Sequence, residues 1–348
     1  MAAIGSGLSA QIGIAAETTP GTAVSPTRFH RFASETLTAK KKIVQVSTLA
    51  AGLQFDRSAA RFTTQRDAGG DINMPVPTKG FGLLLQQMLG SFNATATQQA
   101  TSPAYLQTHV PGVFTGHTFS VQKGVPRTDG TVEPYTYPGC KVTDWELDIA
   151  QSDVLNAKLT LDAWDELTAG TTPPSPSLAT PAYLSASYFS FVSGAILSGG
   201  TATTTSGVCS VSGGAAVAAI RSANVKGKNA SDTSRYFLGG GTTKAEQVQN
   251  AVSSVSGQLV AEFANRTLYD QYRSDGATAI QLNFTGPLIA TGYSCFLNIV
   301  MPSVWLEDGA SPQVPGPGII QQTIPFTALS DDSNPVIQIQ YQSTDTAV

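Results

Sequence analysis

A glycine-rich run that ends in a lysine is the feature of this chain closest to a site for chemistry. Gly239-Gly240-Gly241-Thr242-Thr243-Lys244 has the residue types with which a phosphate-binding loop holds a nucleotide. Such a loop needs the order Gly-Lys-Ser/Thr, because that order aims backbone amides and the lysine at the same phosphates. The order is missing here, so the run predicts a glycine-rich turn.

Histidine and cysteine, the usual zinc ligands, are few and widely spaced. None of the three histidines stands four residues from another ligand, which argues against zinc: His30, His109 and His117. His117 lies beside a predicted strand, which favours a structural role. The three cysteines form neither a metal motif nor a disulfide framework, which indicates free thiols and synthesis in a reducing cytoplasm: Cys140, Cys209 and Cys295.

Two acidic clusters complete the candidates for chemistry. Asp331-Asp332 with Asn334 could bind calcium, but the spacing of a calcium-binding loop is missing, and a turn between strands is favoured. Asp162, Asp165 and Glu166 follow a predicted strand and are interpreted as a solvated edge. Paired carboxylates for sugar hydrolysis need a defined separation, which the sequence does not give, so no such pair is assigned. We therefore predict no catalytic residue, no metal site and no cofactor, in a protein that is not an enzyme.

The elements that would carry these residues repeat along the chain. Residues 70–78 read as a strand that leads into a helix expected over Thr78–Gly90, and residues 257–265 lead into a second helix within Asn265–Gly276. Thr78 and Asn265 stand at matching places as helix caps. An apolar strand follows each helix, near Phe119 in the first half and Phe296 in the second.

The predicted fold is mainly β. Two tandem β-sandwich or barrel domains are expected, each with one short flanking α-helix and a long arm loop. The length of 348 residues is about twice that of a typical domain, and the proline-rich residues 169–181 read as a semi-rigid linker. The expected domains are therefore residues 1–168 and 182–348. Low identity between the halves leaves the alternative open that any two β-rich domains share such patterns.

The composition of the chain limits the kinds of partner that it can bind. Only 13% of residues are charged and the net charge is −4, so the chain lacks the basic footprint of a protein that grips nucleic acid. No run of 18 apolar residues occurs, which predicts no membrane segment. The N-terminal residues have no basic region ahead of an apolar one, and we expect no signal peptide.

One segment is basic. Residues 39–67 have few turn signals and are expected to form a long exposed hairpin, here called the arm. The arm carries six cations: Lys40, Lys41, Lys42, Arg57, Arg61 and Arg66.

Several short motifs resemble one known family. They include Gln11-Ile12-Gly13, the turn Glu17-Thr18-Thr19-Pro20-Gly21-Thr22 and the helix start Gly80-Phe81-Gly82-Leu83-Leu84-Leu85. Ser256-Gly257-Gln258-Leu259 and Ile324-Pro325-Phe326 look like the second half of the same family. Together these motifs resemble the tail tube (major tail) proteins of long-tailed bacteriophages, over nearly the whole chain.

The resemblance implies a structural virion protein that self-assembles. Tail tube proteins form stacked rings around a bore through which the genome enters the host, and six domains line each ring. The implied partners are copies of the chain, other tail proteins at the tube ends, and viral DNA and the tape-measure protein, which pass without specific binding. Because basic residues in the bore would hold phosphates, we expect the six arm cations at contacts between rings.

Alternatives remain for the number of chains in a ring and for the function. Two tube domains per chain would make a ring of three chains with pseudo-sixfold symmetry, favoured over a ring of six chains with an outer second half. A baseplate or decoration protein of the same particle is the nearest rival. A cell-surface β-rich adhesin would need an export signal, and an enzyme would need a cleft with matched carboxylates.

Overall fold

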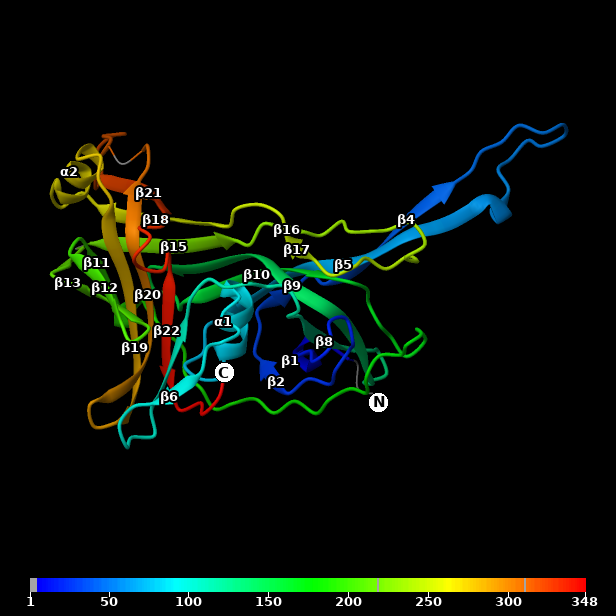
Figure 1. Cartoon of the computed structure of the whole chain (residues 1–348), viewed down its shortest axis with the longest axis horizontal. Coiled ribbons are helices and arrows are strands. Elements are labelled where there is room, and N and C mark those ends of the chain that lie inside the picture. Colours follow the sequence, from blue (N-terminus) through cyan, green and yellow to red (C-terminus); the bar gives the residue numbers. More distant parts are fainter. Residues whose placement is uncertain (1–4, 218, 310) are drawn as a thin grey trace.

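The computed structural model of the chain describes residues 5–217, 219–309 and 311–348. Antiparallel strands dominate, and two short α-helices accompany them, α1 (Gly82–Leu89) and α2 (Thr267–Arg273) (Figure 1). The prediction of a mainly β protein with one short helix in each half is confirmed. Residues 1–4 of the expected first domain lie outside the described residues.

The strands divide between the two halves of the chain. Those of the first half are β1 (Gln11–Ala16), β2 (Arg28–His30), β3 (Ser34–Glu35), β4 (Thr38–Gln45), β5 (Arg61–Pro75), β6 (Ala96–Gln98), β7 (Tyr105–His109), β8 (Phe119–Pro126), β9 (Val132–Ala150) and β10 (Asn156–Ala163). Those of the second half are β11 (Gly194–Ser198), β12 (Thr201–Thr205), β13 (Val208–Ser212), β14 (Ala215–Ala216), β15 (Ile220–Lys228), β16 (Ser231–Asp232), β17 (Val248–Gln249), β18 (Ser254–Glu262), β19 (Thr278–Ala290), β20 (Tyr293–Leu306), β21 (Gln321–Ala328) and β22 (Gln338–Ser343).

Strand pairing follows the same order in both halves. The first half pairs its strands as β2–β1–β8–β9–β10–β5–β4. The second half pairs them as β14–β11–β19–β20–β21–β18–β15. Position by position, the strands also appear in the same order along the sequence, and each helix follows its counterpart strand, α1 after β5 and α2 after β18.

The register agrees as well as the order. Gly70 of β5 lies opposite Leu161, and Gly257 of β18 lies opposite Phe326 at the corresponding place. A Cβ atom on Gly70 would lie 2.4 Å from the carbonyl oxygen of Thr36, and one on Gly257 would lie 2.3 Å from that of Asn224. Both positions therefore need glycine for the same reason, which is the close approach of a backbone carbonyl oxygen from a neighbouring segment.

A bulge recurs at one place. Where β8 meets β9, the register shifts between the pairs Phe119–Cys140 and Val121–Tyr137. Where β19 meets β20, it shifts between the pairs Thr278–Val304 and Ile280–Met301. In each hairpin the partner strand has one extra residue at this point, which bends the strand and increases its twist.

The two halves share a sheet. β15 of the second half pairs with the end of β9 from Asp144 to Ala150, and β7 of the first half pairs with β22. Gly227 of β15 lies opposite Trp145, and a Cβ atom there would come within 2.1 Å of the indole ring. Trp145 is 3% exposed, so glycine at position 227 lets this ring pack into the junction.

The first helix buries one apolar face, whose residues follow the helical spacing i, i+3, i+4 and i+7 in the sequence. Phe81, Leu84, Leu85 and Met88 are at most 1% exposed, and Gly90 ends the helix in a left-handed conformation. The predicted cap is wrong, because α1 begins at Gly82 and the Thr78 hydroxyl instead lies 3.2 Å from the hydroxyl of Ser187.

The second helix is shorter and less buried. At α2 the predicted cap is one residue too early, because Arg266 is the N-cap; Asn265 Oδ1 accepts a hydrogen bond of 2.9 Å from the backbone N–H of Thr267, the first residue of the helix. Leu268 is the buried residue of this helix.

The proline-rich residues 169–181 contain neither helix nor strand and lie against the first half. The side chain of Gln122 on β8 donates hydrogen bonds to the carbonyl oxygens of Pro176 and Ser177 and accepts one from the N–H of Ala179. Residues 176–179 of the segment are thus anchored to β8.

Candidate assembly surfaces

A polar face crosses both halves of the molecule. Neighbouring strands β5, β10, β9, β15, β18 and β21 form one stretch of sheet whose alternate side chains are buried. The other side of this sheet is polar, and one row across it consists of Asn73, Lys158, Glu146, Lys226, Ser256 and Thr327. We call it the polar face.

The cations of the polar face are partly neutralised. Lys158 Nζ lies 3.0 Å from a carboxylate oxygen of Asp71, and Lys226 Nζ lies 3.1 Å from one of Glu146. Asp148 lies two residues after Glu146, on the same side of β9. Burial, with the neighbouring acids Glu146 and Asp153, raises the pKa of Asp148 above the ordinary value. The middle of the face is hollowed between β9, β10 and β15.

The arm protrudes from the body as a hairpin of β4 and the start of β5 (Figure 1). Five of its predicted cations are exposed: Lys40, Lys41, Lys42, Arg57 and Arg61. The structure keeps the three lysines together on β4 and places Arg61 opposite Gln45, farther along the hairpin. Arg66 lies at the base, where its guanidinium is 3.5 Å from the Asp165 carboxylate.

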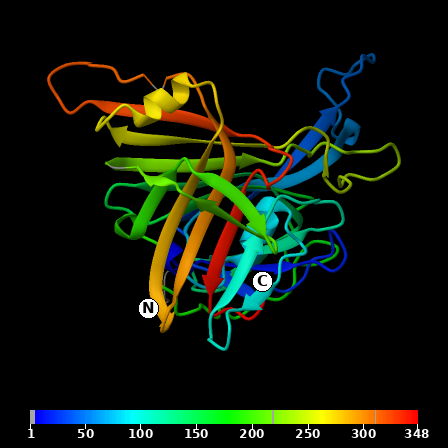
Figure 2. The same ribbon diagram turned by 60° about the vertical axis from the view of Figure 1, so that its left-hand side comes forward.

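The second half also has a long connection, as expected for each half. Residues 229–253 connect β15 to β18, as the arm connects β4 to β5, and they run over the first half in the direction of the arm (Figures 1 and 2). Asn229 begins this segment by donating hydrogen bonds from Nδ2 to the carbonyl oxygens of Met88 and Val142. We call residues 229–253 the clasp, because they hold the second half onto the first.

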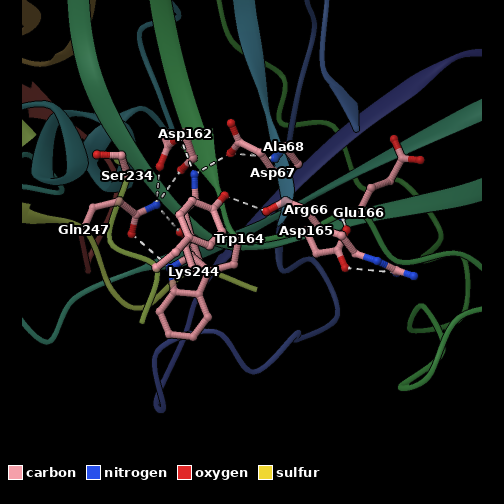
Figure 3. A network of polar contacts seen from close by, with 12 residues as sticks. Arg66, Asp67, Ala68, Asp162, Trp164, Asp165, Glu166, Ser234, Lys244 and Gln247 are labelled. Atoms are coloured by element: carbon pink, nitrogen blue, oxygen red, sulfur yellow. Dashed lines mark hydrogen bonds and ion pairs between the residues drawn. The ribbon is translucent and has the colours of Figure 1, made fainter. Parts of the chain in front are cut away.

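Lys244 is the centre of the clasp (Figure 3). Its side chain is fully buried, and Nζ lies 2.5 Å from Asp67 Oδ1 and 2.6 Å from Asp162 Oδ1. Burial raises the pKa of Asp162, while Lys244 and Gln247 act in the opposite direction. The prediction of a solvated edge is therefore wrong for Asp162, because a loop from the other half covers it.

Two further contacts extend the clasp. Lys141 is 1% exposed and donates to Glu246 Oε1 at 2.6 Å and to the carbonyl oxygen of Gln247 at 2.8 Å. Burial lowers the pKa of this lysine, and the Glu246 carboxylate partly restores it. Gln247 also accepts a hydrogen bond of 3.0 Å from the indole N–H of Trp164.

The remaining predicted residues have structural roles. His109 is buried with Nδ1 2.8 Å from the Ser91 hydroxyl, and burial lowers its pKa to about 3. His117 stacks on Phe92 with ring centroids 3.9 Å apart, as its structural interpretation predicts. Asp331 forms the predicted turn, because its carboxylate accepts backbone N–H groups of Ser333 and Asn334.

Within the described part of the chain, no group of three or more acidic, histidine or cysteine side chains is arranged to hold a metal ion. No helix among residues 5–217, 219–309 and 311–348 is long and apolar enough to cross a membrane. A comparison with family models matches residues 7–328 to a family described as phage tail tube protein. No curated protein matches the chain.

Proposed function

Because the chain belongs to the phage tail tube protein family, we propose that its copies form the stacked rings of a tail tube whose bore conducts viral DNA into the host. In this proposal the chain is a structural protein of the virion tail, made in the host cytoplasm. Other tail proteins bind the ends of the tube, and the tape-measure protein and the DNA pass through it.

The observation that carries the proposal is the continuous polar face. A bore must let a polyanion slide, so its wall should be polar, with few free cations. The polar face fits that need because Lys158 and Lys226 are paired with carboxylates. The acids Asp144 and Asp148 add negative charge beside them. The face also spans both halves, as the wall of a ring must.

We further propose that the chain holds two tube domains, residues 1–168 and 182–348, joined by residues 169–181. The common order of strand pairing supports this proposal, as do the matched glycines Gly70 and Gly257 and the recurrent bulge. Three chains would then supply the six domains of one ring.

The arm is proposed to contact the adjacent ring through its exposed cations. Its length and its distance from the body support a role between copies of the chain (Figure 1). Arg66 is already paired with Asp165, so the proposed contact rests on the other five cations: Lys40, Lys41, Lys42, Arg57 and Arg61.

Electron cryomicroscopy of the purified, concentrated protein tests these proposals. We expect stacked rings of three chains with six similar domains around a bore lined by the polar face. Rings of six chains would retain the tube and reject the trimer. A protein that stays monomeric under all assembly conditions would reject the tube.

A further inference from the structure

The clasp covers a defined place on the first half. It lies over Lys141 of β9 and over Trp164, which directly follows β10. Both residues are fixed by contacts with Glu246 and Gln247 of the clasp. The clasp connects β15 to β18, the third and fourth of the seven matched strands of its half in chain order, and the loop of the arm has the same place between β4 and β5.

The strand register identifies the corresponding place on the second half. Leu161 faces Val142, and its counterpart Phe326 faces Leu306. The residue before Val142 is Lys141, so its counterpart is Trp305. By the same step along β10 and β21, Trp164 corresponds to Leu329.

These counterparts are open to solvent. Trp305 is 39% exposed and Leu329 is 47% exposed. Glu307 and Asp308 follow the tryptophan, and Asp331 and Asp332 follow Leu329 closely, so the apolar patch has an acidic rim. The first half covers this place with the clasp, whereas the second half leaves an apolar patch uncovered.

The arm has the complementary character. It carries seven of the 21 exposed large apolar side chains among the described residues: Ile43, Val44, Val46, Leu49, Leu53, Phe55 and Phe62. Between residues 38 and 63 it also has five cations and one acid, Asp56. An exposed hairpin with this many apolar side chains is a surface made for a partner.

We propose that the paired part of the arm, where β4 meets the start of β5, packs on the Trp305–Leu329 patch of a second copy, the one beside it in the same ring. The inference rests on the proposed tube and deepens it. It repeats between two chains the contact that the clasp makes within one chain. The apolar side chains cover the indole and Leu329, and the lysines of β4 face the acidic rim. This refines the assignment of the arm, because only the tip, with Arg57, then remains for the adjacent ring.

A pair of engineered cysteines tests the contact. Phe62 is 55% exposed at the outer end of the β4–β5 pairing, opposite Val44, and the native cysteines are all buried. We would oxidise tubes of the double variant Phe62→Cys with Leu329→Cys and separate the chains on a non-reducing gel. We expect cross-linked species that stop at the number of chains in one ring, since links within a ring close on themselves.

Three results would overturn the inference. Cross-linked species with more chains than one ring contains would mean that the arm reaches the adjacent ring at this point. Intact tubes without cross-links, or with as many cross-links in the control pair Phe62→Cys with Leu288→Cys, would reject the patch while keeping the tube. Loss of all assembly, in the parent protein too, would instead reject the proposed function.

A second measurement does not depend on disulfide chemistry. Leu329→Ser and Phe62→Ser should each leave the thermal unfolding curve of the dilute protein unchanged, because both side chains are exposed. Each should raise the protein concentration needed for assembly by about tenfold, since each removes apolar contact between copies. Leu288→Ser, at an exposed apolar residue outside the patch, is the matched control. An equal change in the control would contradict the proposed contact.

Discussion

At the scale of single residues, the clasp depends on one buried lysine. Lys244 holds Asp67 and Asp162, which lie 177 and 82 residues away in the sequence. A buried ion pair adds little net stability compared with apolar packing, but removal of one partner leaves a charge without compensation. Lys244 therefore connects the halves because its removal would leave the carboxylates of Asp67 and Asp162 without a partner.

We predict that Lys244→Met lowers the free energy of unfolding by about 3 kcal/mol. This is the lower end of the range for breaking a buried pair, because the Asp67 side chain is 40% exposed and can turn to water. Urea denaturation of the dilute protein measures the change. The control Lys42→Met removes an exposed lysine and should alter stability by less than about 0.5 kcal/mol. Equal losses would mean that the clasp does not depend on Lys244.

Asp148 gives a pH-dependent prediction. Burial raises its pKa, so ionisation is less favourable in the folded chain than in the unfolded chain. The ionised form thus costs stability above the folded pKa, and that cost disappears as the pH falls below the unfolded pKa. Asp148→Asn should raise the free energy of unfolding at pH 7 by about 0.5 kcal/mol and have no effect near pH 3.

An acid of opposite behaviour serves as the control. Backbone and side-chain hydrogen bonds from Thr131 lower the pKa of Asp129, so its ionised form favours folding. Asp129→Asn should therefore destabilise the protein at pH 7. Unfolding curves at the two pH values compare the variants, and a stabilising effect in both would refute the argument from burial.

At the scale of elements, α1 is held in place at its C-terminal end. Gly90 has φ +74°, and the loop after β7 brings the N–H of Gly112 to the carbonyl oxygen of Leu89 at 2.9 Å. A Cβ atom at position 90 would lie 2.7 Å from the carbonyl oxygen of Gly112. Position 90 therefore needs glycine for two reasons: the left-handed backbone conformation and the lack of space for a Cβ atom beside Gly112.

We predict that Gly90→Ala costs about 2 kcal/mol, the sum of left-handed backbone strain and a backbone clash. Gly292→Ala provides a matched comparison, because Gly292 has φ +82° but nothing within 4 Å of a Cβ atom. That variant should lose about 1 kcal/mol. Chemical denaturation compares the two, and equal losses would show that the contact with Gly112 contributes nothing.

At the scale of the whole molecule, the halves act as one curved sheet. The junction of β9 and β15 continues the polar face from the first half to the second without a break. A ring built from such chains would have a bore whose charge is set mostly by this face. The charge balance of the face should then matter more for DNA passage than for folding.

We predict that Glu146→Lys with Asp148→Lys slows DNA ejection from particles built with the variant. Free cations in the bore would bind phosphates, and raising salt from about 50 to about 200 mM should restore much of the rate. Dye fluorescence of released DNA measures the rate after triggering. Asp129→Lys with Glu133→Lys changes the charge equally at the β8–β9 turn and the start of β9, and should leave ejection unchanged. Slowing in the control as well would mean that the polar face does not line the bore.

The sequence alone predicted what depends on local pattern. Period-two alternation indicated a mainly β chain, and the spacing of Phe81, Leu84, Leu85 and Met88 indicated the buried face of α1. The glycines at 70 and 257 marked the repeated core strands. These features could be predicted because they depend on each residue's immediate neighbours along the chain.

Matching of later strands was less successful. Phe119 and Phe296 looked like counterparts, but β8 corresponds to β19 and Phe296 lies in β20. One alternating strand resembles any other, so pattern alone does not decide which strands correspond. Hydrogen-bonded pairing resolved this because it specifies the partner of each strand.

Only the tertiary structure decided which surfaces are covered. Lys244 read as the end of a glycine-rich turn and Asp162 as part of a solvated edge, yet the fold buries them together. Trp305 and Leu329 stay exposed, although the corresponding place in the first half is covered. Burial depends on contacts between segments far apart in the sequence, and the order of strands in the sheet brings those segments together.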